Sequence, residues 1–298
     1  MSRMGDVLAG FHTVWEFDTD SVLIRFERGI RTPKLFQVLG ERRVPFEALS
    51  AVELAPGKKG TVVLRAVPRP GADPLADAAA GQLKESADPY RLVLPAERET
   101  LAEYYADELR SVLDPKAAEP AEQHLVAAPV PPLSFKAYDG KAGFDGETVS
   151  FRWFWTGASS AKWKAGDQHF AVGELAGIEW RSPEVFNGHL RLLRRGPDGG
   201  DPPGPADQDP ASVVFGLGYG LVHESLPFAA AVLQAVQAAD PAPGPAAAGC
   251  PAPVLAADVR PAPADIADRI RHLGALHDAG LLTDAEFSHK KAELLAEL

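Results

Sequence analysis

The sequence has one cysteine and lacks any long apolar segment. Cys250 stands in a stretch rich in proline and alanine, so an intrachain disulfide is excluded and a reducing compartment is expected. No apolar run reaches the roughly 18 residues that a membrane-spanning helix needs. Residues 1–6 lead into the first domain pattern without the apolar core of a signal peptide. We therefore expect a cytoplasmic protein without a membrane span.

Basic residues are also in short supply. The chain has 30 Lys and Arg against 41 Asp and Glu, which gives a formal net charge of -11. Binding to nucleic acid requires clustered basic side chains that neutralise phosphates. We therefore predict no nucleic-acid partner.

Patterns that mark catalytic or metal sites are missing as well. None of the eight histidines follows a His-Glu-x-x-His spacing, Cys250 has no second ligand nearby, and there is no Gly-x-Ser-x-Gly elbow. The glycine-rich segment 216–220 lacks the third-glycine spacing and the βαβ context of a dinucleotide site, so it is interpreted as a flexible turn. The sequence predicts no catalytic residue, cofactor or metal, and hence a nonenzymatic protein.

What the sequence does contain is an internal repeat of domain size. Residues 14–18 recur as 142–146, and the alternating apolar pattern of 21–26 recurs in 148–153, as expected of half-buried strands. A second block follows in each copy, and a third begins at Asp-Pro and ends in an amphipathic helix. Three collinear blocks predict one fold that is used twice.

Each copy combines short strands, glycine and proline turns and a closing helix. Tyr105 and Leu109 in the first helix have counterparts in Phe228 and Val232 of the second. This order predicts a mainly β fold with α (α+β), in which two tandem pleckstrin-homology-like barrels are each capped by a C-terminal helix. The predicted boundaries are 8–114 for the first domain, 115–132 for a linker, 133–238 for the second domain, 239–264 for a disordered Pro/Ala linker, and 265–298 for a C-terminal helical hairpin.

The C-terminal segment has two short amphipathic helices. Gly280 suits the end of the first, and Thr283 to Glu286 form a capping box at the start of the second. Two helices of this size bury too little surface to be stable alone, so they need a partner. That partner is a second copy, another protein or, as the alternative, this chain's own domains. The apolar residues predicted to mediate this contact are Ile266, Ile270, Leu273, Leu276, Leu281, Leu282, Phe287, Leu294 and Leu298.

Both parts of the chain resemble known bacterial families. Residues 277–287 and 290–295 resemble the short C-terminal domain family, SHOCT, a helical hairpin joined by a linker to unrelated domains. This resemblance implies self-association or protein docking and no catalysis. The segments 14–18, 31–34, 42–45 and 81–92 resemble the domain-of-unknown-function 4429 family, which implies a pleckstrin-homology-like fold and transfers no functional residue.

Two surfaces are candidates for binding. A basic cluster in and beside the connection between early strands suits anionic lipid headgroups or acidic peptides, unless it is a solvated face balanced by acidic residues. A second surface would use Phe154, Trp155 and Trp163 as an exposed apolar patch, with core packing or contact between the domains as the alternative. The basic cluster consists of Arg28, Arg31, Lys34, Arg42 and Arg43.

Together these features predict an adaptor. Two domains that bind protein partners would be tethered to a hairpin that makes homo-oligomers, which raises avidity without new interface chemistry. The alternative is a peripheral membrane protein that binds anionic lipid through the basic cluster of the first domain.

Overall fold

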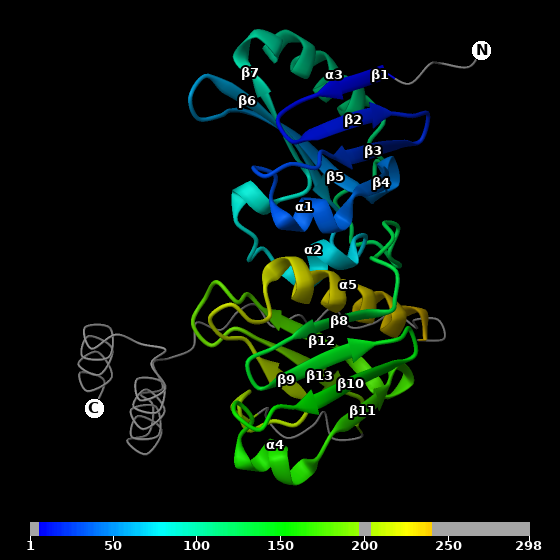
Figure 1. The fold of residues 1–298 in the computed structure, drawn as a ribbon. Coiled ribbons are helices and arrows are strands. Elements are labelled where there is room, and N and C mark those ends of the chain that lie inside the picture. The colour runs from blue at the N-terminus through cyan, green and yellow to red at the C-terminus, as the bar shows by residue number, and fades with distance from the viewer. Residues whose placement is uncertain (1–5, 197–203, 240–298) are drawn as a thin grey trace, which may run out of the picture. The chain divides into compact units, whose positions relative to one another are not determined.

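Each repeat places four strands, then three strands, then a helix, in the same order along the chain. The computed structural model describes residues 6–196 and 204–239 (Figure 1). The strands form four antiparallel sheets, none of them closed, and helices are few. A mainly β fold that is used twice is therefore confirmed.

The first repeat begins with a meander of four neighbouring strands. In β3, Val22, Ile24 and Phe26 are buried while Arg25 is exposed, which is the alternation expected of a sheet with one face toward a core. A three-stranded sheet follows, and α3 packs on its strands. The elements are β1 (Asp6–Ala9), β2 (Thr13–Phe17), β3 (Ser21–Phe26), α1 (Lys34–Leu39), β4 (Glu41–Pro45), η1 (Phe46–Ala48), β5 (Leu49–Pro56), β6 (Thr61–Pro68), α2 (Pro74–Ala79), η2 (Glu85–Ala87), β7 (Arg91–Pro95), η3 (Ala96–Arg98) and α3 (Glu99–Ser111).

The second repeat follows the same plan down to its irregularities. A short 3-10 turn joins the two sheets in each repeat, and each next strand starts with a register shift, at Leu49 in one and Leu175 in the other. A shared bulge at the same place indicates a shared backbone path. The elements are β8 (Leu133–Lys136), β9 (Gly140–Phe144), β10 (Thr148–Trp153), α4 (Ser160–Ala165), β11 (Gln168–Ala171), η4 (Val172–Glu174), β12 (Leu175–Arg181), β13 (His189–Arg194), β14 (Ser212–Val214) and α5 (Val222–Ala238).

The two closing helices differ in how much of their surface is covered. In α3, the buried residues Ala102, Tyr105, Ala106 and Leu109 lie on one face, and the other face is exposed. In α5, the run from Leu226 to Val232 is buried throughout. A helix that is apolar on all sides must be covered on all sides. Within its own repeat, α5 is covered by β8 and β12. From the other direction it is covered by α1 and α2 of the first repeat (Figure 1).

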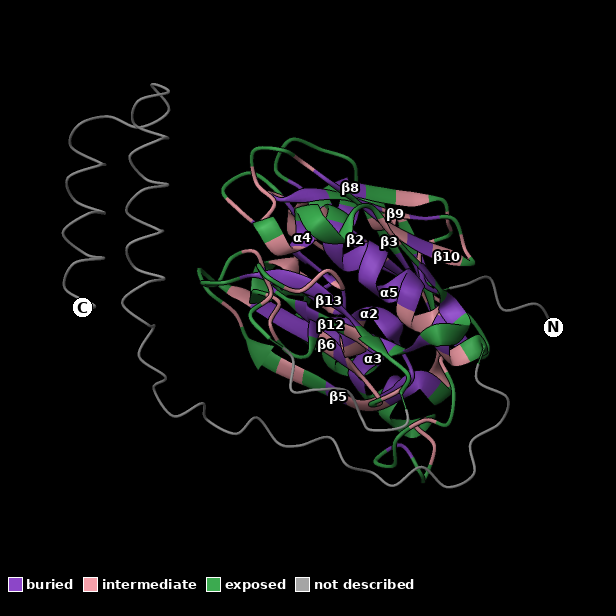
Figure 2. Cartoon of the chain, turned by 90° about the horizontal axis from the view of Figure 1, so that it is seen from below, coloured by how far each residue is buried: buried purple, intermediate pink, exposed green. Residues whose placement is uncertain are grey.

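This contact joins the repeats through one hydrophobic core. Leu35, Leu75, Ala78 and Ala79 of the first repeat belong to the same buried cluster as the core of the second. Figure 2 shows α5 and α2 coloured mostly as buried between the two sets of sheets. The small alanine side chains of α2 and α5 allow the two helices to approach closely.

The segment 115–132, predicted as a linker, packs against both repeats. Val126 is buried, and its amide donates to the Ala72 carbonyl of the first repeat. The amides of His124 and Ala128 donate to the side chains of Gln237 and Gln234 on α5, at 2.8 and 2.7 Å. The connection therefore adds polar contacts to the apolar contact between the repeats.

Candidate functional site

The predicted basic cluster is divided between the surface and the interior. Arg28 and Arg31 lie exposed in the connection between β3 and α1, Lys34 begins α1, and Arg43 is exposed on β4. Arg42 is buried, because neighbouring residues of a strand face opposite sides of the sheet. Arg42 therefore does not lie on the surface with the other members of the basic cluster.

Arg42 belongs to a buried polar group that fixes α2. Its Nη2 lies 2.5 Å from Oδ1 of Asp73, and the hydroxyl of Tyr90 donates to Oδ2 of Asp73 at 2.6 Å. Asp73 also caps α2 by accepting hydrogen bonds from the amides of Leu75 and Ala76. Burial raises the pKa of Tyr90, which keeps the phenol protonated as a donor. The group holds the start of α2 against β4.

The other four residues of the basic cluster are exposed, and they differ in whether they form ion pairs. Arg43 donates to Asp18 at 3.2 Å and to the hydroxyl of Ser21 at 2.8 Å. Within the described ranges, Arg28, Arg31 and Lys34 form no ion pair. These three cations remain available to an anionic ligand.

The aromatic residues of the second repeat also separate into two groups. Trp153 is buried, and its indole Nε1 donates to the Gly166 carbonyl at 2.7 Å. Phe154 is half-buried. Trp155 and Trp163 are 82% and 54% exposed, and their rings meet edge to face with centroids 6.2 Å apart. Two exposed tryptophans in contact form an apolar patch at the surface.

The repeat seen in the fold coincides with a match to a known family. The family model described as Domain of unknown function (DUF4429) matches residues 15–110 and again 142–233. The chain belongs to the DUF4429 family. A second model, Short C-terminal domain (SHOCT), matches residues 268–295. A search of curated proteins finds no match to the chain.

The predicted docking residues of the C-terminal segment lie outside the residues that the structure describes. They span Ile266 to Leu298, and the SHOCT match covers most of this range.

The second DUF4429 repeat has a buried ion pair of its own, which the sequence did not reveal. Nζ of the fully buried Lys162 lies 2.5 Å from Oδ2 of Asp139 and 5.1 Å from the ring centroid of Trp153. The other carboxylate oxygen of Asp139 accepts a hydrogen bond from the amide of Val214. Burial raises the pKa of Asp139 and lowers the pKa of Lys162. No local pattern distinguishes Lys162 from the exposed Lys164 two positions later.

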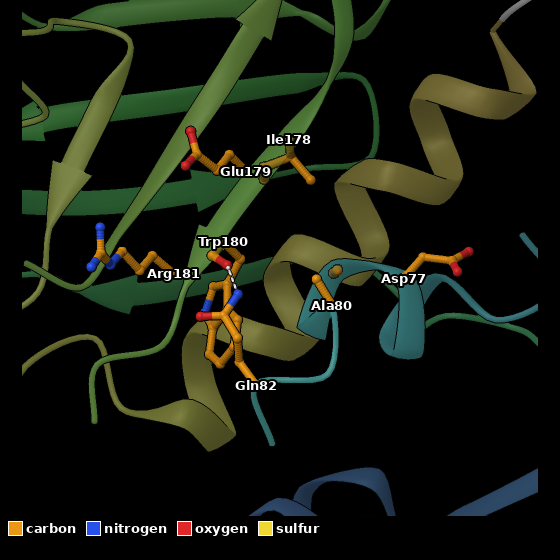
Figure 3. A pocket seen from close by; sticks show the side chains of 8 residues that line it. Asp77, Ala80, Gln82, Ile178, Glu179, Trp180 and Arg181 are labelled. Atoms are coloured by element: carbon orange, nitrogen blue, oxygen red, sulfur yellow. Dashed lines mark hydrogen bonds between the residues drawn. The ribbon is translucent and has the colours of Figure 1, made fainter. Parts of the chain in front are cut away.

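A small cavity of about 390 Å³ lies where the two DUF4429 repeats meet, between α2 and β12. Gln82 and Trp180 come together there, whereas the side chains of Glu179 and Arg181 point away from Gln82 (Figure 3). Catalysis requires polar groups that converge on one point. The polar side chains of this cavity diverge.

A larger groove of about 1260 Å³ runs along the first DUF4429 repeat, between the outer face of the three-stranded sheet and the segment 81–90. Val63, Val67 and Val93 are among the residues that line it. Except for Lys58, the charged residues that line it are in ion pairs in the described structure, as in the contact of Arg65 with Asp88 at 3.1 Å. Pairing leaves little net charge to select an ionic ligand.

Two further absences hold for residues 6–196 and 204–239. None of their helices is both long and apolar enough to cross a bilayer. Their His, Cys, Asp and Glu side chains form no group of three that could hold a metal ion.

Proposed function

We propose that the protein is a nonenzymatic cytoplasmic adaptor, in which two pleckstrin-homology-like repeats form one binding body and the SHOCT segment self-associates or docks on a protein partner. The observation that carries this proposal is the position of α5 between the repeats. A helix buried on all sides makes the pair of repeats a single body instead of two independently moving domains. A single body presents its binding surfaces at a fixed spacing.

The order of elements supports the pleckstrin-homology-like assignment. Four strands, three strands and a C-terminal helix follow one another in each repeat. In the first repeat, Tyr105 of α3 stacks on Phe17 of β2 with ring centroids 4.4 Å apart, so the helix contacts both sheets. A helix in this position closes the open side between two sheets, as such a barrel requires.

The use of the buried charged groups supports a role without catalysis. Arg42 is paired with Asp73, Lys162 is paired with Asp139, and each pair anchors a short helix. Side chains that are held in buried ion pairs are not free to transfer protons to a substrate.

The Pro/Ala stretch 239–264 links this body to the SHOCT match. If the SHOCT segments of several chains associate, each assembly carries several copies of the two-repeat body. Weak contacts then add up to higher avidity.

The decisive experiment is the absolute mass of the full chain in solution, measured by light scattering over a concentration series. We expect an oligomer for the full chain and a monomer for a chain that ends after Ala239. A full-length L281D/L294D variant is the matched control, because it keeps the linker and changes only predicted contact residues. Cys250→Ser excludes a disulfide as the cause. If the full chain and the truncated chain have the same oligomeric state, self-association through the tail is refuted.

A second candidate function is attachment to anionic membranes through the first repeat. It is favoured by Ile30, which is fully exposed between Arg28 and Arg31, two cations without an ion pair in the described structure. Reversing both arginines to glutamate would abolish sedimentation with anionic vesicles if this loop is the contact.

A further inference from the structure

One end of the second repeat gathers exposed apolar side chains from three connections. Trp155 follows β10, Trp163 lies on α4, and Tyr219 belongs to the turn before α5. Tyr138, in the turn between β8 and β9, meets Tyr219 with ring centroids 6.4 Å apart. A Cβ atom on Gly157 would lie only 2.2 Å from the Tyr138 carbonyl oxygen, so the Trp155 connection packs directly on this turn. We name Tyr138, Trp155, Trp163, Leu217 and Tyr219 the aromatic end.

Leu217 is the tip of this surface. It is fully exposed in a tight turn closed by a bridge between Gly216 and Tyr219. Gly218 and Gly220 have φ values of +80° and +65°, which side chains rarely adopt. A Cβ atom on Gly216 would lie 2.9 Å from Cβ of Tyr138. Because these positions are glycines, the turn packs closely against Tyr138, and Leu217 projects from it into solvent.

A row of basic side chains lies next to the aromatic end. Lys136, Lys141 and Arg152 are register partners on the neighbouring strands β8, β9 and β10, and all three are exposed. Side chains in register on one face are about 5 Å apart, and like charges at that distance destabilise a sheet. Asp167 compensates only part of this charge, at 3.8 Å from Arg152. The amide of Gly220 donates a hydrogen bond to the carbonyl of Lys136, and this bond connects the basic row to the turn that carries Leu217.

The first repeat does not share this row. The corresponding register partners there are Ala9, Val14 and Arg25. Arg25 is paired with both Glu16 and Glu41. The basic row is therefore a feature of the second repeat and is not required by the fold.

We propose that the aromatic end and the basic row of the second repeat together bind the surface of a bilayer that contains anionic lipids. Leu217 and Trp155 enter the boundary between headgroups and acyl chains, where indole rings are favoured. The basic row contacts the anionic headgroups. A bilayer accepts projecting side chains anywhere on its surface, whereas a protein partner has to offer a matching pocket for each. Neither cavity described above includes a residue of the aromatic end.

The test uses the full-length protein with vesicles of phosphatidylcholine alone, or of phosphatidylcholine and phosphatidylglycerol in equal parts. Of the five tryptophans, Trp15, Trp153 and Trp180 are buried, so Trp155 and Trp163 report the environment of the surface. We expect their emission to shift to the blue with the anionic vesicles only. Brominated acyl chains should quench it. Because the basic row acts through charge, binding should weaken as salt is added.

Two variants of the second repeat locate the contact. W155S/L217S removes the projecting apolar side chains, and K136E/K141E reverses two charges of the row. Each should lower the partition coefficient in sedimentation about tenfold or more, as expected from the loss of apolar insertion or of charge attraction. All four residues are exposed, so thermal unfolding should match the wild type.

The matched control is R28E/R31E in the corresponding connection of the first repeat, which should bind vesicles like the wild type. If only this variant loses binding, the contact belongs to the first repeat and the inference is wrong. It is also wrong if the full chain sediments with neither vesicle, if it binds both vesicles equally, or if W155S/L217S and K136E/K141E bind like the wild type. The oligomeric mass of the chain is a separate readout, so failure here leaves the proposed self-association untouched.

Discussion

Gln82 of the first repeat hydrogen-bonds to the main chain of Trp180 in the second. Its Nε2 donates to the Trp180 carbonyl at 3.0 Å (Figure 3). Its Oε1 accepts a hydrogen bond from the amide of Ser182 at 2.9 Å. The carboxamide thus takes the place that the backbone of a neighbouring strand would take beside the end of β12. The contact fixes the register of one repeat on the other, which apolar packing alone leaves open.

Replacing Gln82 by alanine should weaken the contact between the repeats. Two backbone hydrogen bonds are lost, each worth about 0.5–1.5 kcal/mol, so the free energy of unfolding should fall by about 1–3 kcal/mol. Urea unfolding measures this change. Lys84→Ala is the control, because it removes an exposed ion pair with Glu184 across the same contact and should change stability by less than about 1 kcal/mol. An equal loss in both variants would mean that the Gln82 hydrogen bonds add nothing beyond ordinary surface contacts.

Adjacent arginines on β4 should respond very differently to substitution. Arg42→Met leaves Asp73 buried without its cation, a change that costs about 3–5 kcal/mol of stability. Arg43→Met removes an exposed pair with Asp18 and should cost less than about 1 kcal/mol. Chemical denaturation of the two variants side by side tests this contrast. Similar midpoints would argue against a structural role for the buried group.

Local periodicity explains what the sequence predicted correctly. Residues 21–26 and 148–153 alternate between apolar and polar positions, and they form β3 and β10 with the apolar side chains inward. The closing helices were also predicted from spacing, and they appear as α3 and α5. These features depend on neighbours in the chain, which a sequence displays directly.

The composition of the basic cluster could not be predicted in the same way. The alternation along β4 does place Arg42 on the same face as the buried Val44, which is a signal for burial. The buried charge of Arg42 is stabilised because Arg42 forms an ion pair with Asp73, which lies 31 positions away in the sequence. Likewise, Asp139 and Lys162 are 23 positions apart, and the residues next to each of them in the sequence give no sign that the two form an ion pair. Contacts at such separations depend on tertiary structure.

The pH dependence of stability should contain a term from His223. Burial at the start of α5 lowers the pKa of His223, Lys34 of the first repeat lowers it further, and Glu224 acts in the opposite direction. Because the unfolded chain then binds the proton more readily than the folded chain, the free energy of unfolding should fall as the pH drops below about 6.5. Urea unfolding across about pH 5–8 should show this slope, and His223→Gln should reduce it.

Two controls sharpen the His223 measurement. Lys34→Met removes a nearby cation and should reduce the slope in part. His169→Gln, at an exposed position on β11, should leave the slope unchanged. A wild-type slope that survives in His223→Gln would assign the pH dependence to another group.

The shared core predicts that the two repeats unfold together. Leu75 of α2 is fully buried in the cluster that also contains the core of the second repeat. Leu75→Ala should therefore lower the free energy of unfolding by about 2–5 kcal/mol, whereas Leu101→Ala at an exposed position of α3 should cost much less. Calorimetry of the wild type should show one transition, because separating the repeats would expose α5. If it showed two transitions and Leu75→Ala shifted only one of them, the repeats would be independent domains, and a fixed spacing of their binding surfaces would no longer follow.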